Sequence, residues 1–278
     1  ELGVDVKSRE DKSGGETVLE LRNISVMGDK GLLNLKNASL KIRSGEILGI
    51  AGVAGSGQKE LAAVIAGLRQ PECGQVLLAG EDVSQKSPAE RLALGVAYIP
   101  EDRMGVGLVA SMNMMENAIL RSSEQEPFSK KGVLQHGEIL CHTKQLVAEY
   151  DIKNAGLAKP VSLMSGGNLQ KLLIGREVAG APKVIVAAYP VHGLDIGATE
   201  SIHNILISQR NQGAAILLIS EDLEELMAMA DRIAALFEGE VMGEVDIADA
   251  TYDGVGQMML GQRRDSAGEK ETAHENTL

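Results

Sequence analysis

"GEILGIAGVAGSGQKELAAVIAGL" (residues 45–68) is the stretch that decides the fold. An apolar run over 45–52 predicts a buried strand, and the segment over 58–68 has helical spacing of its apolar residues and a stop signal at Gly67. Three glycines stand between the two elements: Gly52, Gly55 and Gly57. Such a loop fits phosphate binding, or it simply builds a tight turn from strand to helix, and taken alone it leaves both interpretations open.

Strands and helices continue to alternate on both sides of this stretch. Residues 17–26 and 36–43 partly alternate in polarity, as paired strands at a sheet margin do. The apolar runs over 183–188 and 213–220 predict buried strands, each followed by a helix-like segment. Buried strands that alternate with helices imply a parallel sheet covered on both faces, so the expected fold class is α/β.

The domain boundaries follow from changes in composition. Apolar residues recur at helical spacing over 103–168, which predicts an inserted helical subdomain. Residues 1–16 are charged and contain glycine, so they are expected to be a linker from a preceding domain. Residues 263–278 have few apolar side chains and are expected to be a disordered tail. One domain is therefore predicted over 17–262.

The composition restricts the possible classes of protein. The net charge of −12 at pH 7 argues against a broad nucleic-acid surface, which would need clustered Lys and Arg. The longest apolar stretches are shorter than the about 18 residues that a bilayer span requires. Cys73 and Cys141 lie far apart without the spacing of metal ligands, and we expect reduced thiols. We expect no nucleic-acid partner, no membrane span and no metal ligated in this domain's own site.

A second glycine motif, "LMSGGNLQK" (163–171), also opens a helix. A Ser hydroxyl, free backbone amides and the positive end of a helix together make an anion receptor, although an ordinary Ser-capped helix has the same pattern. The apolar strand predicted over 183–188 leads through a turn to "GLD" at 193–195. The order of these three motifs, with a helical insert between the first and the second, is hard to obtain by chance.

With these motifs in this order, the chain resembles the nucleotide-binding domain of ABC transporters over nearly all of residues 17–262. The matching segments are "GVAGSGQKEL" (52–61) at the Walker A position, "YIPEDR" (98–103) at the Q-loop, "LMSGGNLQK" (163–171) at the signature motif, "VIVAAYP" (184–190) at Walker B, "GLD" (193–195) at the D-loop and "ISEDLEEL" (219–226) at the switch region. The resemblance implies a P-loop NTPase core with a mixed sheet, an antiparallel β-subdomain and the inserted helical subdomain, and it implies ATP and Mg²⁺ as cofactors.

The resemblance also assigns residues to sites. Positions next to the domain's own nucleotide are Gly52, Gly55, Ser56, Gly57, Gln58, Lys59, Glu60 and Glu101. Positions that meet a partner's ATP are Ser165, Gly166, Gly167 and Asn168, with Asp195 of the D-loop at the boundary between the two domains.

The closest resemblance is to the second half of the tandem ATPase chains that serve importers of simple sugars and nucleosides, where "GQxEL", "PEDR" and "SGGN" also occur. It implies a first ATPase half, expected in the same chain, as the main partner. It further implies transmembrane permease subunits, an extracellular substrate-binding protein acting indirectly, and a location on the cytoplasmic face of the cell membrane.

Several family positions carry unsuitable side chains here. Gln58 replaces the Walker A Lys and Glu60 replaces its hydroxyl residue, while Lys59 is rotated by about 100° on the helix, away from the phosphates. Ala188 and Tyr189 stand where the Mg²⁺-orienting Asp and the general base belong. Glu101 and Glu221 replace Gln and His, so three carboxylates, with Glu60, would surround a triphosphate. We expect no catalytic residue in this domain's own site, negligible ATPase activity of its own, and Mg²⁺ mainly at the partner's composite site.

Three other interpretations remain open at this point. A self-sufficient soluble ABC-type ATPase would need the catalytic groups that are missing here. A scaffold that docks a permease without touching nucleotide would not need the intact signature, and an unrelated α/β fold would not need three motifs in order. The histidines His136, His142, His192 and His203 lack ligand spacing and are expected at the surface or at helix caps.

Overall fold

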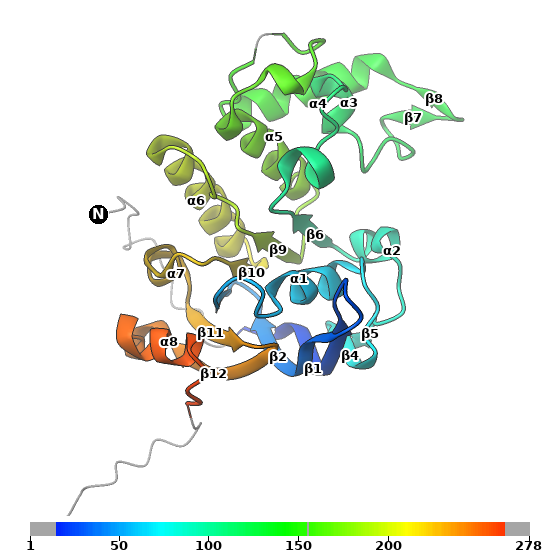
Figure 1. Cartoon of the computed structure of the whole chain (residues 1–278). Coiled ribbons are helices and arrows are strands. Elements are labelled where there is room, and N and C mark those ends of the chain that lie inside the picture. Colours follow the sequence, from blue (N-terminus) through cyan, green and yellow to red (C-terminus); the bar gives the residue numbers. More distant parts are fainter. Residues whose placement is uncertain (1–14, 155, 265–278) are drawn as a thin grey trace, which may run out of the picture.

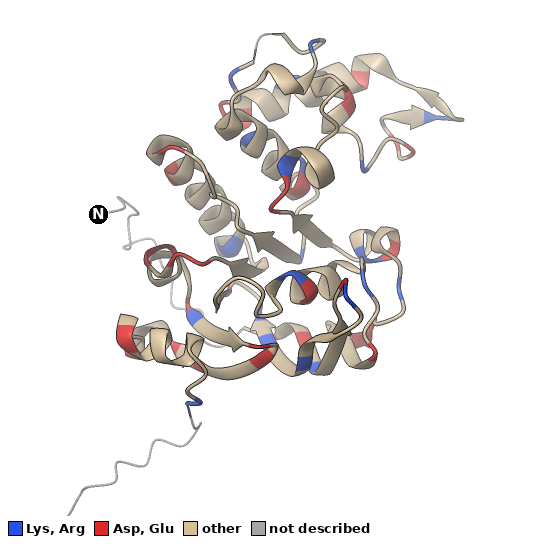
Figure 2. Cartoon of the chain, viewed as in Figure 1, with Lys and Arg blue, Asp and Glu red and all other residues tan. Residues whose placement is uncertain are grey.

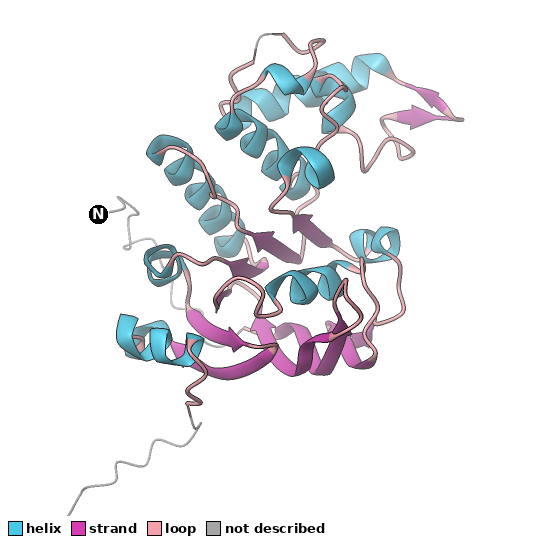
Figure 3. Ribbon diagram, in the orientation of Figure 1, coloured by secondary structure: helices cyan, strands magenta, loops and turns pink. Residues whose placement is uncertain are grey.

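The computed structural model describes residues 15–154 and 156–264. The expected linker over 1–16 and the expected tail over 263–278 lie outside these residues, apart from the two positions nearest the domain in each case. Figure 1 shows a central sheet with helices on both sides, a second sheet beside it and a lobe made mainly of helices at one end. Figure 3 shows the same arrangement by type of element.

The central sheet has six strands in the order β12-β11-β3-β10-β9-β6. Their bounds are β3 Ile47–Ala51, β6 Val96–Ile99, β9 Val184–Ala188, β10 Ala215–Ile219, β11 Arg232–Phe237 and β12 Glu240–Asp246. All neighbours run parallel except β11 and β12, which are antiparallel. β3, β9 and β10 are buried along their whole length. The expected α/β class and mixed sheet are therefore confirmed.

Alternate residues of these buried strands enter two separate apolar clusters. On β10, Ile216 and Leu218 belong to the cluster on one face, whereas Leu217 and Ile219 belong to the cluster on the other. The first face is covered by α5 Gly166–Val178, α6 Ile196–Asn211, α7 Leu223–Met229 and α8 Tyr252–Met259. The second face is covered by α1 Gln58–Ala66 and the second sheet.

The second sheet is antiparallel, with strand order β2-β1-β4-β5. Its strands are β1 Thr17–Met27, β2 Leu33–Arg43, β4 Cys73–Leu78 and β5 Glu81–Asp82. The pairing of β1 with β2 confirms the strands expected from alternating polarity, although they form their own sheet instead of the margin of the central one. α2 Pro88–Ala93 follows, with Ser87 as its N-cap.

A buried arginine holds the far end of α1. Arg91 of α2 is fully buried, and its guanidinium donates to the backbone oxygens of Val64 and Ile65 in the last turn of α1 and of Ser84. Burial lowers the pKa of Arg91. Among the described residues, Val64 O otherwise accepts only from the C-cap amide of Gly67, and the last carbonyls of a helix lack intrahelical donors, so the arginine fixes the helix that starts at the glycine loop.

The lobe between β6 and β9 is less helical than expected. Its elements are the π-helix η2 Arg103–Gly107, α3 Met114–Ala118, β7 Ser129–Lys130, β8 Val133–Leu134, α4 His136–Glu149, the 3-10 helix η3 Val161–Leu163 and α5. The β7–β8 hairpin was not expected. Lys131 and Gly132 both have positive φ, as a two-residue hairpin turn of this kind requires, and such a turn leaves little trace in helical periodicity. A 3-10 turn, η4 Ile247–Asp249, precedes α8.

Charged residues of both signs are interspersed over the elements (Figure 2). Among the helices of the described part of the chain, none combines the length and hydropathy that crossing a bilayer requires.

Candidate functional site

The loop from β3 to α1 needs glycine at two positions. Gly55 and Gly57 have φ of +85° and +101°, a region that residues with a side chain rarely adopt. A Cβ on Gly57 would also lie 2.5 Å from the backbone oxygen of Asn34. Gly57 is the N-cap of α1 and gives that helix no side-chain cap. The loop therefore presents the start of α1 with its first amides unsatisfied by a side chain.

The three side chains that follow already have partners within the protein. Gln58 is 3% exposed, and its Nε2 donates to the backbone oxygen of Val53 at 3.0 Å. Lys59 turns outward and pairs with Asp29 at 3.0 Å. Glu60 is 5% exposed, and its Oε1 accepts from Asn34 Nδ2 at 3.1 Å. The Lys59 cation is thus paired with Asp29, and the Glu60 carboxylate lies in the first turn of α1.

Beside this loop lies a cavity of about 510 Å³. Its lining includes Glu60, Glu101 and Glu221 together with Tyr189, and Asp29, Lys30 and Lys59 at one side. The three carboxylates that the resemblance placed around a triphosphate therefore border one cavity. A helix N-terminus favours an anion, but carboxylates around it oppose that preference.

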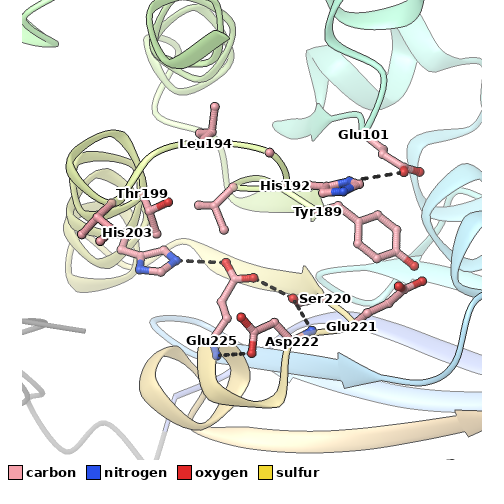
Figure 4. Close-up of a pocket in the computed structure, with 13 residues that line it drawn as sticks. Glu101, Tyr189, His192, Leu194, Thr199, His203, Ser220, Glu221, Asp222 and Glu225 are labelled. Carbon is pink, nitrogen blue, oxygen red and sulfur yellow. Dashed lines mark hydrogen bonds and ion pairs between the residues drawn. The ribbon is translucent and has the colours of Figure 1, made fainter. Parts of the chain in front are cut away.

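The end of β9 offers no ligand for a metal. Ala188 is buried and apolar. Tyr189 has a positive φ of 49°, and its ring lies between Glu101 and Glu221 (Figure 4). Burial, with the charges of Glu221 and Glu101 as further causes, raises the pKa of Tyr189 to about 12. The phenol stays protonated at neutral pH, so it cannot act as a general base there.

These donors do not fit a magnesium nucleotide at the home loop, the name used below for residues 52–61. No set of three or more His, Cys, Asp and Glu side chains with metal-ligating geometry occurs within residues 15–154 and 156–264. No Ser or Thr follows Gly57 at the first turn of α1, and the strand end supplies no Asp. Phosphate contact at this loop would rest on backbone amides, with Lys30 and Lys59 among the residues that line the cavity.

The start of α5, residues 165–168, is built differently, and we call it the signature end. Ser165 is the N-cap residue, but its side chain makes no capping bond. Its Oγ instead accepts from Asn168 Nδ2 at 2.7 Å, while Asn168 Oδ1 accepts from the amide of Lys153 at 2.7 Å. This differs from the ordinary Ser-capped helix that the sequence left open. The Ser165 hydroxyl hydrogen remains free to donate to an anion.

The first intrahelical bond of α5 runs from Leu169 N to Ser165 O. The amides of Gly166, Gly167 and Asn168 therefore precede the helical ladder, and none of them has a partner within the described parts of the chain. No acidic residue lies in the first turn of α5. Residues 165–168 do not line the cavity at the home loop. This end can accept an anion, and that anion would not be one held in the home cavity.

An arginine missed by the sequence analysis stands next to the signature end. A Cβ on Gly166 would lie 3.5 Å from a guanidinium nitrogen of Arg103. Arg103 Nε donates to Gln170 Oε1 at 2.9 Å, and its guanidinium also donates to the backbone oxygen of His192. Gln170 Nε2 donates to the backbone oxygen of Pro190 at 2.6 Å. Arg103 thus joins the loop after β6, the signature helix and the turn after β9, and burial lowers its pKa.

The turn after β9 ends at Asp195, the N-cap of α6, whose Oδ1 accepts from Ala198 N at 2.8 Å. Next to it, Ile196 is 75% exposed. A Cβ on Gly167 would lie 2.8 Å from the Cβ of Ala198, so this glycine lets α5 and α6 approach closely. The turn and the signature end therefore form one connected surface.

A second cavity, of about 400 Å³, lies between this turn and the switch segment (Figure 4). It shares Glu101, Tyr189 and Glu221 with the cavity at the home loop. His203 also lines it, and the expectation of a surface or capping histidine is wrong for this residue, which is fully buried on α6. Its spacing of three residues from the buried Leu206 on the same helix was a signal that could have indicated this. His192, by contrast, is exposed, with Nδ1 3.9 Å from Glu101.

The sequence and the fold of this chain are similar to those of known proteins. A family model described as "ABC transporter" matches residues 35–190. The glucose import ATP-binding protein TsgD13 of Haloferax volcanii is 40% identical over 255 residues, which is 91% of this chain and 46% of that protein. The guanosine import ATP-binding protein NupO of Bacillus subtilis is 38% identical over 96% of this chain and 52% of that protein. The chain thus spans about half the length of the curated relatives it matches.

Solved structures share the fold. An ATP-binding cassette of an ABC transporter in its ADP conformation has a TM-score of 0.73 at 23% identity and covers 89% of this chain and 100% of that one. A bacterial ABC transporter cassette solved as a dimer has a TM-score of 0.70 at 23% identity, covering 82% of this chain and 98% of that one.

Proposed function

The chain belongs to the ABC transporter family of ATP-binding domains, and from that premise we propose that it is the half of an importer ATPase that lends its signature end to a partner's ATP. In this proposal the home loop hydrolyses ATP negligibly. ATP and Mg²⁺ are held by the Walker residues of the partner domain, and Ser165, Gly166, Gly167 and Asn168 close over the phosphates from this side.

The single observation that carries the proposal is the difference between the two helix starts. The signature end has free amides, a hydroxyl that can donate, and the Arg103 cation nearby, without an acid in its first turn. The home loop also has amides, but Glu60 stands in the first turn of α1, and β9 ends at the apolar Ala188. Anion binding is favoured at the first and opposed at the second.

The length of the relatives supports a partner in the same polypeptide. Because this chain spans about half of each, the other half has room for a second ATPase domain. The similarity to a cassette solved as a dimer is consistent with pairing of two such domains. The exposed Ile196 and Asp195, the N-cap of α6, would then lie at the boundary between the two domains.

The import role and its cargo come from the relatives. Those compared include import proteins for glucose, guanosine, nucleosides and ribose. We propose nucleosides or simple sugars as cargo, permease subunits as membrane partners, and an extracellular substrate-binding protein that acts through the permease. The domain would be peripheral, on the cytoplasmic face of the membrane.

The test uses the protein that contains this chain and its partner ATPase domain. Ser165→Ala should remove most of the ATPase activity, since it removes a donor to the phosphates, whereas Gln58→Ala should have a much smaller effect. Activity that survives Ser165→Ala and depends on Gln58 would favour a self-sufficient ATPase. Binding of a fluorescent ATP analogue that ignores both substitutions would favour a scaffold without nucleotide contact.

A further inference from the structure

A buried chain of hydrogen bonds joins α6 to the switch segment. His203 is fully buried and Glu225 is 3% exposed, and His203 Nε2 lies 3.0 Å from Glu225 Oε1. The other carboxylate oxygen, Oε2, accepts from Ser220 Oγ at 2.6 Å. His203 Nδ1 has no partner within the described residues. A buried carboxylate needs partners for both oxygens, and here one is on α6 and the other is at the end of β10.

The Glu225 carboxylate controls the backbone on both sides of Glu221. Ser220, which precedes Glu221, donates to the carboxylate, and the same Ser220 Oγ accepts from the amide of Asp222 at 3.1 Å. Asp222 in turn caps α7 by accepting from the amide of Glu224 at 2.8 Å. Glu221 is therefore held between two fixed neighbours, with its side chain facing both cavities (Figure 4).

At its other end, this series of hydrogen bonds reaches α6 and, through that helix, the turn after β9. His203 lies on α6, the helix that begins at the Asp195 cap beside the exposed Ile196. A helix moves as a rigid element, so a displacement of the turn reaches His203. The hydrogen bond at Nε2 is the polar link by which His203 passes that displacement to Glu225. An apolar side chain in the same place would fill the space without making this connection.

We propose that His203 is a positioning residue that couples the turn at Asp195 to the switch residue Glu221 through Glu225 and Ser220. The effect of this coupling on ATP hydrolysis rests on the proposed function, because in that proposal the turn faces the partner domain. Glu221 faces the cavities next to the nucleotide position. The coupling itself is a property of this chain alone.

The first test therefore uses the chain alone. Hydrogen exchange of peptides covering 219–226 and 193–200 is compared in the parent, His203→Leu and His203→Gln. His203→Leu should speed exchange over 219–226 by about tenfold, whereas His203→Gln, whose amide nitrogen can take the place of Nε2, should stay near the parent. Ile205→Val on the same helix is the matched control and should leave the switch unchanged. Unchanged exchange over 219–226 in His203→Leu overturns the proposal.

A second variant covers the case in which His203→Leu does not fold. Ser220→Ala removes the hydrogen bond from Ser220 to Glu225, at the other end of the hydrogen-bond series, and leaves the His203 and Glu225 pair intact. It should speed exchange over 219–226 but not over 193–200. Where His203→Leu folds, the double variant Ser220→Ala with His203→Leu should exchange no faster over 219–226 than the more severe single variant, because the two sites act in series. Additive effects, or unchanged exchange over 219–226 in Ser220→Ala alone, would contradict the coupling.

The third measurement needs the assembled ATPase. His203→Leu should lower kcat by about tenfold with little change in KM, and His203→Gln should restore kcat, since a coupling change of this size is typical of positioning residues. Loss of coupling in the chain alone without any change in kcat would keep the structural inference and reject the proposed function. Equal defects in the Leu and Gln variants would show a role in stability only.

Discussion

The home loop and the signature end use the same backbone device and differ in the side chains around it. Each follows a buried or fixed segment, each opens a helix with glycine, and neither helix has a side-chain cap. At α1 the first turn contains Glu60, and Glu101 and Glu221 face the same cavity. At α5 the first turn has no acid, and Arg103 lies beside Gly166. The glycine pattern therefore shows where phosphate could bind, and the neighbouring charges decide whether it does.

The charges of the side chains affect the binding of an anion more strongly than the helix N-terminus does. Two like charges about 4 Å apart repel by about 4 kcal/mol at an effective dielectric of about 20, and solvent reduces this at the exposed Glu101 and Glu221. A helix N-terminus offers typically about 0.3–1 kcal/mol to an anion. Charge placed by side chains thus outweighs the helix dipole, and the predictions below move charge or contacts between the two sites.

The largest effect should come from giving the signature end the charge of the home loop. Gly166→Glu places a carboxylate at the start of α5, where a Cβ meets nothing nearer than 3.5 Å, so the fold should be kept. Repulsion of the partner's phosphates should lower the ATPase activity of the assembled protein by at least about a hundredfold.

Gly180→Glu provides the matched control, because Gly180 is exposed beyond the other end of α5 with open space at its Cβ. The same added charge there should change the ATPase activity by less than about twofold. Equal losses in the two variants would mean that the total charge matters and the signature end does not.

A smaller effect is expected when the cation next to the signature end is removed. Arg103→Leu loses the bonds to Gln170 and to the His192 backbone, each of which involves a charged group and is worth about 1.5–3 kcal/mol at most. We expect kcat of the assembled ATPase to fall by about tenfold to thirtyfold. Arg263→Leu, which removes an exposed pair with Glu240, should have little effect. A similar loss in both would contradict the role of Arg103.

Periodicity and turn chemistry were sufficient to predict β1, β2, β3, β9 and β10, α1 with its stop at Gly67, and the glycine-opened start of α5. These features depend on residues close together in the sequence. The bonds of Arg103 to Gln170 and of His203 to Glu225 join distant segments, and no local pattern encodes them. The unbonded cap at Ser165 depends in the same way on Asn168 being held by the Lys153 backbone.

The home loop should respond to substitution in stability more than in activity. Gln58→Ala removes one of the two hydrogen bonds to the backbone oxygen of Val53, which keeps its bond from the Ser56 amide, so the free energy of unfolding should fall by about 1 kcal/mol in chemical denaturation. The ATPase activity of the assembled protein should stay within about threefold of the parent, because this loop hydrolyses nothing in the proposal. Gln75→Ala removes an exposed bond to Asp82 and should change stability by less than about 0.5 kcal/mol. A loss of ATPase activity much larger than threefold, with the free energy of unfolding lowered by only about 1 kcal/mol, would show that the home loop takes part in hydrolysis.

The smallest effect concerns the carboxylates that set the home cavity apart. The pKa of Tyr189, raised to about 12 by burial and then by the charges of Glu221 and Glu101, reports their field. Because the pKa is raised above its ordinary value of about 10, the stability that neutral Tyr189 contributes is fully present below pH of about 10 and is lost as pH rises through about 12. Tyr189→Phe should flatten the fall of Tm in that range.

Glu221→Gln should lower the pKa of Tyr189 in an ultraviolet titration, read as the difference between variants with and without the phenol. Glu224→Gln makes the same charge change on α7 at a residue that lines neither cavity, and it should shift the pKa less. Equal shifts in both would mean that the field at Tyr189 comes from the whole acidic surface, and the contrast between the two helix starts would then lose its local cause.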